Sequence, residues 1–404
     1  MADNNENKVL NVPPLRFPEF SGEWEKCKFG DIATGFDYGM NAAAKPFDGE
    51  NKYIRITDID EASSTYNDTD IVSPDGSLTD NYVVNDRDIL LARTGASTGK
   101  SYLYRKSDGK LYYAGFLIRA NVTEHNPYFV FSQLHTHRYW RWVSIMSARS
   151  GQPGINSQEY SSFPIFTTSL HEENKIASLL SRLDERIATQ NKIIEKYESL
   201  IQAIIYQKKT VGIRKGNWQK TELSDVLQER IEKNINGHII CSVSVSKGVV
   251  NQIEYLGRSF AAKETLHYNV VKYGDIVYTK SPTGDFPYGI VKRSYIKDDV
   301  AVSPLYGVYM PVNDYIGVIL HFYFMQPSNV FNYLHPLIQK GAKNTINITN
   351  ERFLKNSIPL PKTENEAIYI ANTLISIQKK IDIEKKMLRS YEKEKQYLLS
   401  KMFI

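Results

Sequence analysis

A glycine-rich stretch with a lysine and a serine, ARTGASTGKSYL at residues 92–103, is the first place where this sequence could do chemistry. It suggests the phosphate-binding loop of nucleotide hydrolases, in which backbone N–H groups cradle phosphates. That loop needs four residues between its first glycine and the Gly-Lys-Ser, whereas three separate Gly95 from Gly99. The shorter spacing would disturb the ring of N–H groups, so we expect another role for this stretch.

Histidines and scattered carboxylates are the next candidates. The His-Thr-His run at 135–137 lacks a Cys or carboxylate at a ligand spacing, so structural histidines are favoured over a metal site. Asp75, Asp108 and Lys110 match in type the carboxylates and lysine of a metal-dependent nuclease. They lie in turn-like sequence with no counterpart in the second half of the chain. A nuclease or NTPase acting alone therefore stays an alternative that these residues do not favour.

Two polar loops in each half of the chain have compositions that suit the binding of phosphates and base edges better than any catalysis considered above. The first loop has a counterpart at 279–289, TKSPTGDFPYG, which keeps the basic and hydroxylated residues but drops Gly-Lys-Ser; a second pair lies at 147–158 and 339–350. Arginine and lysine donate to phosphates and guanine edges, and amide side chains suit adenine. A solvated turn would have a similar composition. We predict that these loops bind DNA through Arg93, Thr94, Ser97, Thr98, Lys100, Arg149, Gln152, Asn156, Lys280, Ser281, Thr283, Lys340, Lys343 and Asn344.

The elements that must position these loops are written twice. GEWEKCKFGDI begins at Gly22 and GNWQKTELSDV at Gly216, an offset of 216 − 22 = 194. Two long polar-apolar segments begin at Ile176 and Ile370, and 370 − 176 is again 194. Between these blocks the offset changes, which indicates a fixed frame with a variable interior. The sequence predicts two copies of a unit about 190 residues long.

Each copy is predicted to close with a long helix. SLHE at 169–172 and TENE at 363–366 are capping boxes, in which the first side chain accepts an N–H and the glutamate reaches back. No proline or glycine interrupts roughly 38 residues after either box, or about 57 Å of helix. Apolar side chains then recur at spacings of three and four; these are Leu180, Leu183, Ile187, Ile194, Tyr197, Ile201, Leu374, Ile377, Ile381, Leu388, Tyr391 and Leu398.

So narrow an apolar seam is not stable alone in water and needs a second helix. We predict that the two helices pair with each other as an antiparallel coiled coil, rather than each packing only on its own domain. Gln190 and Glu384 interrupt the two seams at equivalent positions, as polar residues that fix register do. Such a coil would be a rigid spacer between two globular domains.

The fold class predicted is α+β, with two mixed α/β domains in tandem. Strand-like runs at 52–59, 87–94 and 110–122 precede a helix over 128–147, and the second copy has runs at 239–246, 274–280 and 305–312. The expected divisions are a tail at 1–20, a first domain at 21–167, a helical spacer at 168–209, a linker at 210–215, a second domain at 216–361 and a second spacer at 362–404.

Composition narrows the class of protein. The 404 residues are 42% hydrophobic and 24% charged, which is ordinary for a globular protein, and the net charge of +5 permits an anionic partner. No run of about 18 apolar residues or apolar leader is present, so no membrane span or signal peptide is expected. Only two cysteines occur, far apart, which is typical of a reducing cytoplasm.

The whole pattern resembles a known family. LRFPEFSGEWEKCKFGDI at 15–32, the repeat, the DILLARTG and GDIVYTKSPTG blocks and the helices after FPI and IPLP are similar to the specificity subunit of type I restriction-modification systems. The resemblance implies two target-recognition domains, each reading half of a bipartite double-stranded DNA target, and a helical spacer that sets the gap. It also implies binding of two methyltransferase (modification) subunits and of restriction (motor-nuclease) subunits, in the cytoplasm.

In that family S-adenosylmethionine is bound by the modification subunits, and ATP and Mg²⁺ serve the restriction subunits. The resemblance therefore implies no cofactor in this chain and no catalysis by it. A coiled-coil adaptor that binds only proteins remains a second alternative.

Overall fold

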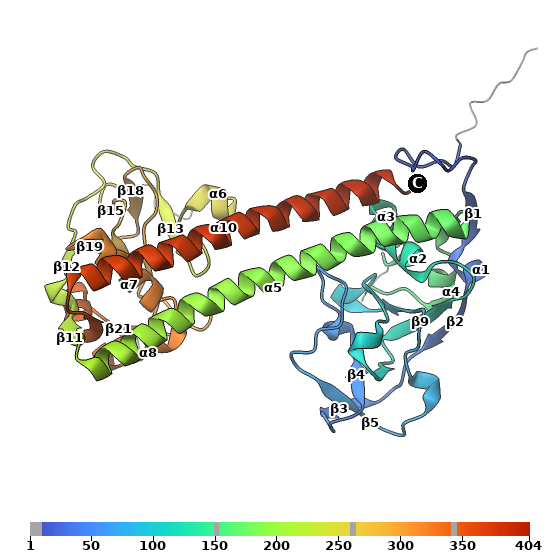
Figure 1. Cartoon of the computed structure of the whole chain (residues 1–404), viewed down its shortest axis with the longest axis horizontal. Helices are drawn as coiled ribbons and strands as arrows, with labels where there is room; N and C mark the ends of the chain where they lie inside the picture. The colour runs from blue at the N-terminus through green and yellow to red at the C-terminus, as the bar shows by residue number, and fades with distance from the viewer. Residues whose placement is uncertain (1–9, 149–152, 259–263, 341–345) are drawn as a thin grey trace, which may run out of the picture. The chain divides into compact units, whose positions relative to one another are not determined.

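The computed structural model describes residues 10–148, 153–258, 264–340 and 346–404 (Figure 1). They form two compact units: unit 1 comprises the chain up to Asn191 together with Met387–Ile404, and unit 2 comprises Lys192–Lys386. Each unit combines a mixed α/β domain with a segment from each of two long helices. Among the described helices, none is long and apolar enough to cross a membrane.

Unit 1 is built around a four-stranded antiparallel sheet in the order β2-β9-β6-β7. Its strands are β2 (Ala33–Tyr38), β9 (Leu117–Val122), β6 (Asp88–Ala92) and β7 (Ser101–Leu103). Every residue of β6 is buried because alternate side chains point to opposite faces: Ile89 and Leu91 enter one apolar cluster, and Leu90 and Ala92 enter another. The strand that leads into the first polar loop is thus fixed on both sides.

Smaller elements complete unit 1. Three two-stranded pairs are β1 (Glu25–Lys28) with β10 (Pro164–Thr167), β3 (Ala43–Pro46) with β5 (Val72–Asp75), and β4 (Lys52–Ile54) parallel to β8 (Leu111–Tyr113). The short helices are α1 (Phe29–Ile32), α2 (Pro127–Gln133), α3 (His137–Met146) and α4 (Ser157–Ser161).

Unit 2 repeats the central sheet in the same order. Its strands run β12 (Leu227–Glu229), β19 (Gly307–Pro311), β16 (Ile276–Tyr278) and β17 (Val291–Arg293). The register matches as well, because buried Asp88 accepts the N–H of Asn85 at 2.7 Å and buried Asp275 accepts that of Lys272 at 2.8 Å. Both aspartates close the same tight turn before the central strand, which confirms the predicted repeat.

The remaining elements of unit 2 surround that sheet. The strand pairs are β11 (Trp218–Glu222) with β22 (Ser357–Pro361), β13 (Cys241–Ser244) with β14 (Gly248–Asn251), β15 (Asn269–Val271) with β18 (Val300–Val302), and β20 (Gln339–Lys340) with β21 (Ile346–Asn347). The helices are α6 (Gln252–Leu256), α7 (Asp314–Tyr323), α8 (Pro327–Leu334) and α9 (Asn350–Leu354).

The two long helices are α5 (Leu170–Lys215) and α10 (Glu364–Lys401) (Figure 1). Within unit 1 they run antiparallel: Leu180 and Leu399 share one apolar cluster, and Asp184 binds Lys395 at 2.6 Å. Within unit 2, Glu198 binds Lys385 at 2.6 Å and Lys208 lies over the ring of Tyr369. The predicted antiparallel pair is therefore confirmed in each unit separately.

The predicted seam faces the interior along both helices. Buried members are Leu180, Leu183, Ile194, Ile201, Leu374, Ile377 and Ile381, and half-buried members are Ile187, Tyr197, Leu388, Tyr391 and Leu398. Gln190, the polar residue of the first seam, is also buried, whereas Glu384 is half-buried. Full or partial burial of each apolar member follows from the spacing of three and four, which keeps one stripe toward the partner helix.

The predicted linker at 210–215 is wrong, because α5 continues through Lys215. Its glycine, Gly212, is helical: a Cβ there would come within 2.0 Å of the Trp218 ring, so the residue is small because the tryptophan packs on the helix. The sequence alone shows a Gly that usually weakens a helix, and only the packing shows why it is tolerated.

Two other elements are broken where a single one was predicted. The helix over 128–147 is two helices, since Thr136 begins α3 by accepting the N–H of Tyr139. The strand over 110–122 is divided into β8 and β9 by a turn in which Leu117 donates to the carbonyl of Ala114. Side-chain capping and a glycine at 115 are the local signals for these breaks.

Both predicted capping boxes are half formed. Ser169 accepts the N–H of Glu172 at 3.3 Å, and Thr363 accepts that of Glu366 at 3.4 Å. The glutamates do not reach back. Glu172 instead binds Arg16 and the Thr168 hydroxyl, and Glu366 accepts the indole N–H of Trp218.

Candidate nucleic-acid interface

The first predicted loop of unit 1 leaves β6 at Ala92, forms a 3₁₀ turn over Gly95–Ser97 and returns as β7. Gly99 adopts a φ of 92°, its carbonyl accepts the hydroxyl of Tyr139 at 2.8 Å, and its N–H donates to Tyr160 at 3.2 Å. A Cβ at this position would lie 2.8 Å from Val143. The glycine of the Gly-Lys-Ser is thus required by packing on α3 and α4, and not by a phosphate.

The second predicted loop joins the first through the backbone. Gly95 donates to the carbonyl of Pro153 at 3.0 Å, and Ile155 donates to that of Arg93 at 2.9 Å. Thr94 and Gly154 form an isolated antiparallel bridge between these bonds. Two segments about 60 residues apart therefore make one continuous surface, as the prediction of a shared function requires.

Arg93 is held in place by an aromatic residue that the sequence analysis did not select. Its guanidinium lies over the ring of Tyr38 at 4.6 Å from the centroid and donates to the carbonyl of Gly115 at 3.5 Å. The Tyr38 hydroxyl accepts the N–H of Ser157 at 3.2 Å, and this contact lowers the pKa of Tyr38. Tyr38 therefore links the arginine of the first loop to the end of the second.

The other candidates in unit 1 differ in how free their polar groups are. Thr98 is buried and donates its hydroxyl to the carbonyl of Gly95 at 2.8 Å, so we do not expect it to touch DNA. Asn156 caps α4 by accepting the N–H of Glu159 at 2.9 Å, which occupies the amide oxygen that a bidentate adenine contact needs. Lys100 lies 3.2 Å from the exposed carboxylate of Glu61, while Thr94 and Ser97 are half-buried. Arg149 and Gln152 lie outside the described residues.

The first loop of unit 2 has another conformation. Lys280 has a φ of 59°, unusual for a residue with a side chain, and its burial lowers the pKa of its ammonium group. Thr283 and Phe286 exchange backbone hydrogen bonds of 3.0 and 2.9 Å, which close a small hairpin. Ser281 and Thr283 are exposed at its tip. As in unit 1, a basic residue follows the end of the central strand, but the loop of unit 2 is longer than that of unit 1.

The second loop of unit 2 is described in part. Lys340 is paired with Ile346 in the short β20–β21 ladder. Thr349 caps the helix α9 by accepting the N–H of Arg352 at 3.2 Å. Lys343 and Asn344 lie outside the described residues, so their assignment to the DNA surface stays a prediction.

Three of the residues that could have formed an enzyme site, His135, Asp108 and Lys110, have structural contacts. His135 lies between the carbonyl of Phe131 and the hydroxyl of Ser64, each at 2.9 Å, and burial lowers its pKa to about 4. Asp108 accepts the hydroxyl of Tyr102 at 2.7 Å, and Lys110 lies over the ring of Tyr112. Within the described ranges, no three His, Cys, Asp or Glu side chains are grouped to hold a metal ion.

Residues 21–199 match the family model described as the type I restriction modification DNA specificity domain. This part of the chain therefore carries the DNA specificity domain of type I restriction-modification specificity subunits. It is 22% identical over 425 aligned positions to the type I restriction enzyme MjaVIII specificity subunit of Methanocaldococcus jannaschii, covering 98% of this chain and 95% of that one.

The fold agrees with this family. The crystal structure of the S subunit of a type I restriction-modification system from M. genitalium superposes with a TM-score of 0.61 at 12% identity, over 97% of this chain and 99% of that one. A chain from a structure on complex assembly and conformational transition of the type I system aligns at 13% identity with a TM-score of 0.49, covering 96% and 99%.

Proposed function

We propose that the chain is the non-catalytic subunit that gives a type I restriction-modification complex its DNA sequence specificity, and that each unit reads one half of a bipartite target. The observation that carries this proposal is the surface of unit 1 at which Arg93, backed by Tyr38, lies at the junction of the two polar loops. A guanidinium fixed on an aromatic ring is preorganised for a guanine edge or a phosphate.

The repeated sheet supports two reading heads with different preferences. In both units the central strand, β6 or β16, is locked by the same buried aspartate turn, while the loops that follow differ in length and conformation. A constant frame with unlike loops presents two unlike surfaces. We expect Arg93 and Lys100 to serve one half-site and Lys280, Ser281 and Thr283 the other.

Other subunits supply the chemistry in this proposal. Two methyltransferase subunits bind S-adenosylmethionine and accept the flipped target adenines, and restriction subunits use ATP and Mg²⁺. A chain with two similar units suits two copies of one partner. The purified chain alone should therefore neither cleave DNA nor hydrolyse ATP, and either activity would favour a nuclease or NTPase instead.

Methylation mapping tests the proposal directly. DNA from cells that carry this chain with its modification subunit should show methylated adenines in one sequence made of two short parts and a fixed gap. Replacing residues 93–100 by the loop of a homologue should change one part only, and replacing 279–289 should change only the other. Methylation that does not depend on either loop would contradict the proposal and favour an adaptor that binds proteins alone.

The paired helices are proposed to set the gap. Deleting one heptad at paired positions from both α5 and α10 removes about 10 Å of helix, which corresponds to roughly three base pairs. The mapped gap should shorten while both half-sites stay the same. A deletion from α5 alone breaks the register of the seam and serves as the destabilised control. An unchanged gap in the double deletion would remove the spacer role.

A further inference from the structure

A turn beside the DNA-reading loop carries a large apolar side chain into solvent. Residues 114–117 connect β8 to β9, and Phe116 at the tip is 58% exposed. Burying a phenylalanine stabilises a protein by about 1.5–3 kcal/mol relative to leaving it in water. The turn lies at the end of the sheet where Arg93 is found, because the Arg93 N–H donates to the Phe116 carbonyl at 3.0 Å.

The backbone of this turn is fixed from two sides. Gly39 donates to the carbonyl of Leu117 at 3.1 Å, and Gly115 donates to that of Met40 at 2.8 Å. A Cβ on Gly39 would lie 2.3 Å from the carbonyl of Ala114, so the two chains touch backbone to backbone. On the other side, the Arg93 side chain reaches the carbonyl of Gly115 at 3.5 Å. The exposed ring is therefore presented on a rigid support.

Unit 2 has the same feature with different residues. The strand register places Leu305 at the position of Phe116, since β16 pairs with β19 as β6 pairs with β9. Leu305 is 71% exposed, and Tyr306 donates to the carbonyl of Ser303 at 3.0 Å to form the same turn. The Asn269 amide donates to the carbonyl of Tyr306 at 2.9 Å. That carbonyl is the counterpart of the one that Gly39 binds in unit 1, so unrelated donors fix the same atom.

We propose that Phe116 and Leu305 are apolar wedges that insert between base pairs, one in each half-site. Apolar side chains used in this way unstack a base step and bend the duplex, and a wedge works best when its backbone is held before binding. The inference rests on the proposed function and deepens it: Arg93 or Lys280 binds the edge or the phosphates, and the neighbouring turn opens the step. An aromatic ring stacks on the exposed base, whereas leucine only fills the gap.

The test uses the reconstituted complex with its modification subunits and duplexes of the mapped target. A 2-aminopurine placed at successive positions becomes fluorescent where stacking is lost. Phe116→Ala should remove the fluorescence signal in one half-site only, and it should weaken binding of the target duplex about tenfold. Leu305→Ala should act on the other half-site alone. Phe116→Leu should keep the signal, because the second copy already uses leucine.

Matched controls are Leu78→Ala in unit 1 and Ile235→Ala in unit 2, which truncate other exposed apolar side chains. If both wedge variants bind and unstack the target as these controls do, while the wild-type complex still discriminates its sequence, the wedge is overturned and the proposed function stands. A wild-type complex that does not discriminate between target and scrambled DNA would instead overturn the proposed function itself.

Discussion

Each repeat has a tryptophan near its start and a glutamate in the first turn of its long helix, but the two units use these residues differently. In unit 2, the Trp218 indole donates to Glu366 at 3.0 Å. In unit 1, Arg16 donates to both oxygens of Glu172 at 2.7 Å. The buried indole N–H of Trp24 has no hydrogen-bond partner among the residues that the structure describes. The equivalent glutamates thus have different partners: Glu366 accepts one hydrogen bond from a neutral indole, whereas Glu172 forms a buried ion pair.

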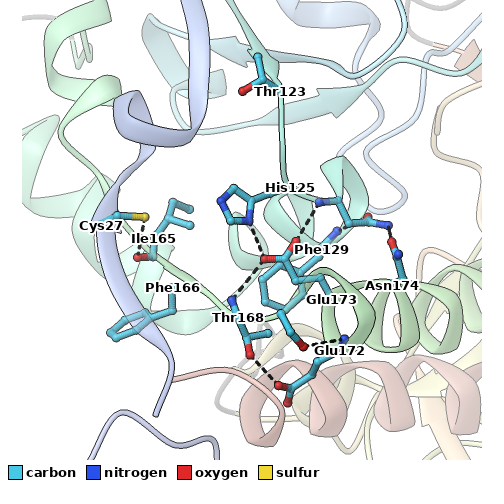
Figure 2. Close-up of polar contacts among 12 residues, drawn as sticks. Cys27, Thr123, His125, Phe129, Ile165, Phe166, Thr168, Glu172, Glu173 and Asn174 are labelled. Carbon is cyan, nitrogen blue, oxygen red and sulfur yellow. Dashed lines mark hydrogen bonds and ion pairs between the residues drawn. The ribbon is translucent and has the colours of Figure 1, made fainter. Parts of the chain in front are cut away.

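The difference comes from the N-terminal segment of unit 1. The Arg16 guanidinium also donates to the carbonyls of Gly22 and Ser21, at 2.5 and 3.1 Å, so it ties this segment to the beginning of α5. The next residue, Glu173, is buried and accepts from the N–H of Asn126 at 2.9 Å, with His125 at 2.8 Å (Figure 2). Two adjacent carboxylates therefore hold separate parts of unit 1. The repeat gives both units the same arrangement of elements, and the segment that carries Arg16, which precedes the first repeat, determines how Glu172 is bound.

The largest expected effect is the loss of unfolding free energy when the Arg16–Glu172 ion pair is broken. Arg16→Met leaves the Glu172 carboxylate buried without its cation, which costs about 3–5 kcal/mol. Glu366→Gln in unit 2 disturbs one hydrogen bond and should cost only about 1 kcal/mol. Urea unfolding with hydrogen exchange read separately for peptides of the two units measures both changes. Adding Glu172→Gln to Arg16→Met should restore most of the loss, and equal effects of the single changes would contradict the comparison.

The next largest effect compares glycine substitutions in the first loops of the two units. Gly99→Ala forces a Cβ against Val143 at a positive φ, so unit 1 should lose about 2–4 kcal/mol. Gly284→Ala, in the hairpin of unit 2, meets open space and should lose only about 1–2 kcal/mol from its backbone conformation. Denaturant midpoints of the two variants test this order. A reversed order would show that the first loop is less tightly packed than its contacts indicate.

Acid should weaken both units through one half-buried histidine each. Burial lowers the pKa of His135 to about 4 and that of His321, which also faces Lys292 and Arg293, to about 3. The folded state keeps these rings neutral while the unfolded chain binds protons below about pH 6.5, so stability is complete above that pH and falls as the pH drops toward 4.

The slope should not exceed about 1.4 kcal/mol per pH unit for each histidine. His135→Gln should flatten the pH dependence of unit 1 between pH 6 and 4 and leave that of unit 2 unchanged. The same hydrogen-exchange peptides report it. An unchanged slope in unit 1 would mean that His135 is protonated in the folded protein.

The last predictions concern single contacts with DNA. Lys100→Ala should weaken binding to all sequences and lower the salt slope by about one, as expected for one phosphate contact. Lys280→Ala, and Gln152→Ala in the undescribed part of unit 1, should relax the choice at one base pair by about 1–3 kcal/mol. Binding titrations at several salt concentrations separate these outcomes. If the salt slope is unchanged in Lys100→Ala, the lysine does not contact a phosphate and pairs only with Glu61.

Much of the frame could be predicted from the sequence because it depends on short-range patterns. The offset of 194 revealed the repeat, and the seam from Leu180 to Leu398 predicted both long helices and their pairing, because spacings of three and four define one helix face. Arg93 was selected from its place after a buried strand. Tyr38 and Phe116 were missed. Phe116 lies in the run at 110–122 that was predicted as one strand, where only Gly115 marked a turn, and no element was predicted around Tyr38.

The sequence by itself determined the two-fold organisation, the helical pair and the position of the polar loops, since each of these follows from local periodicity and turn chemistry. The tertiary structure alone decided which groups are free to act. It used Thr98 and Asn156 for backbone contacts, gave Glu172 to Arg16, and set Phe116 in solvent beside Arg93. These choices depend on contacts between residues far apart in the chain, for which one sequence carries no periodic signal.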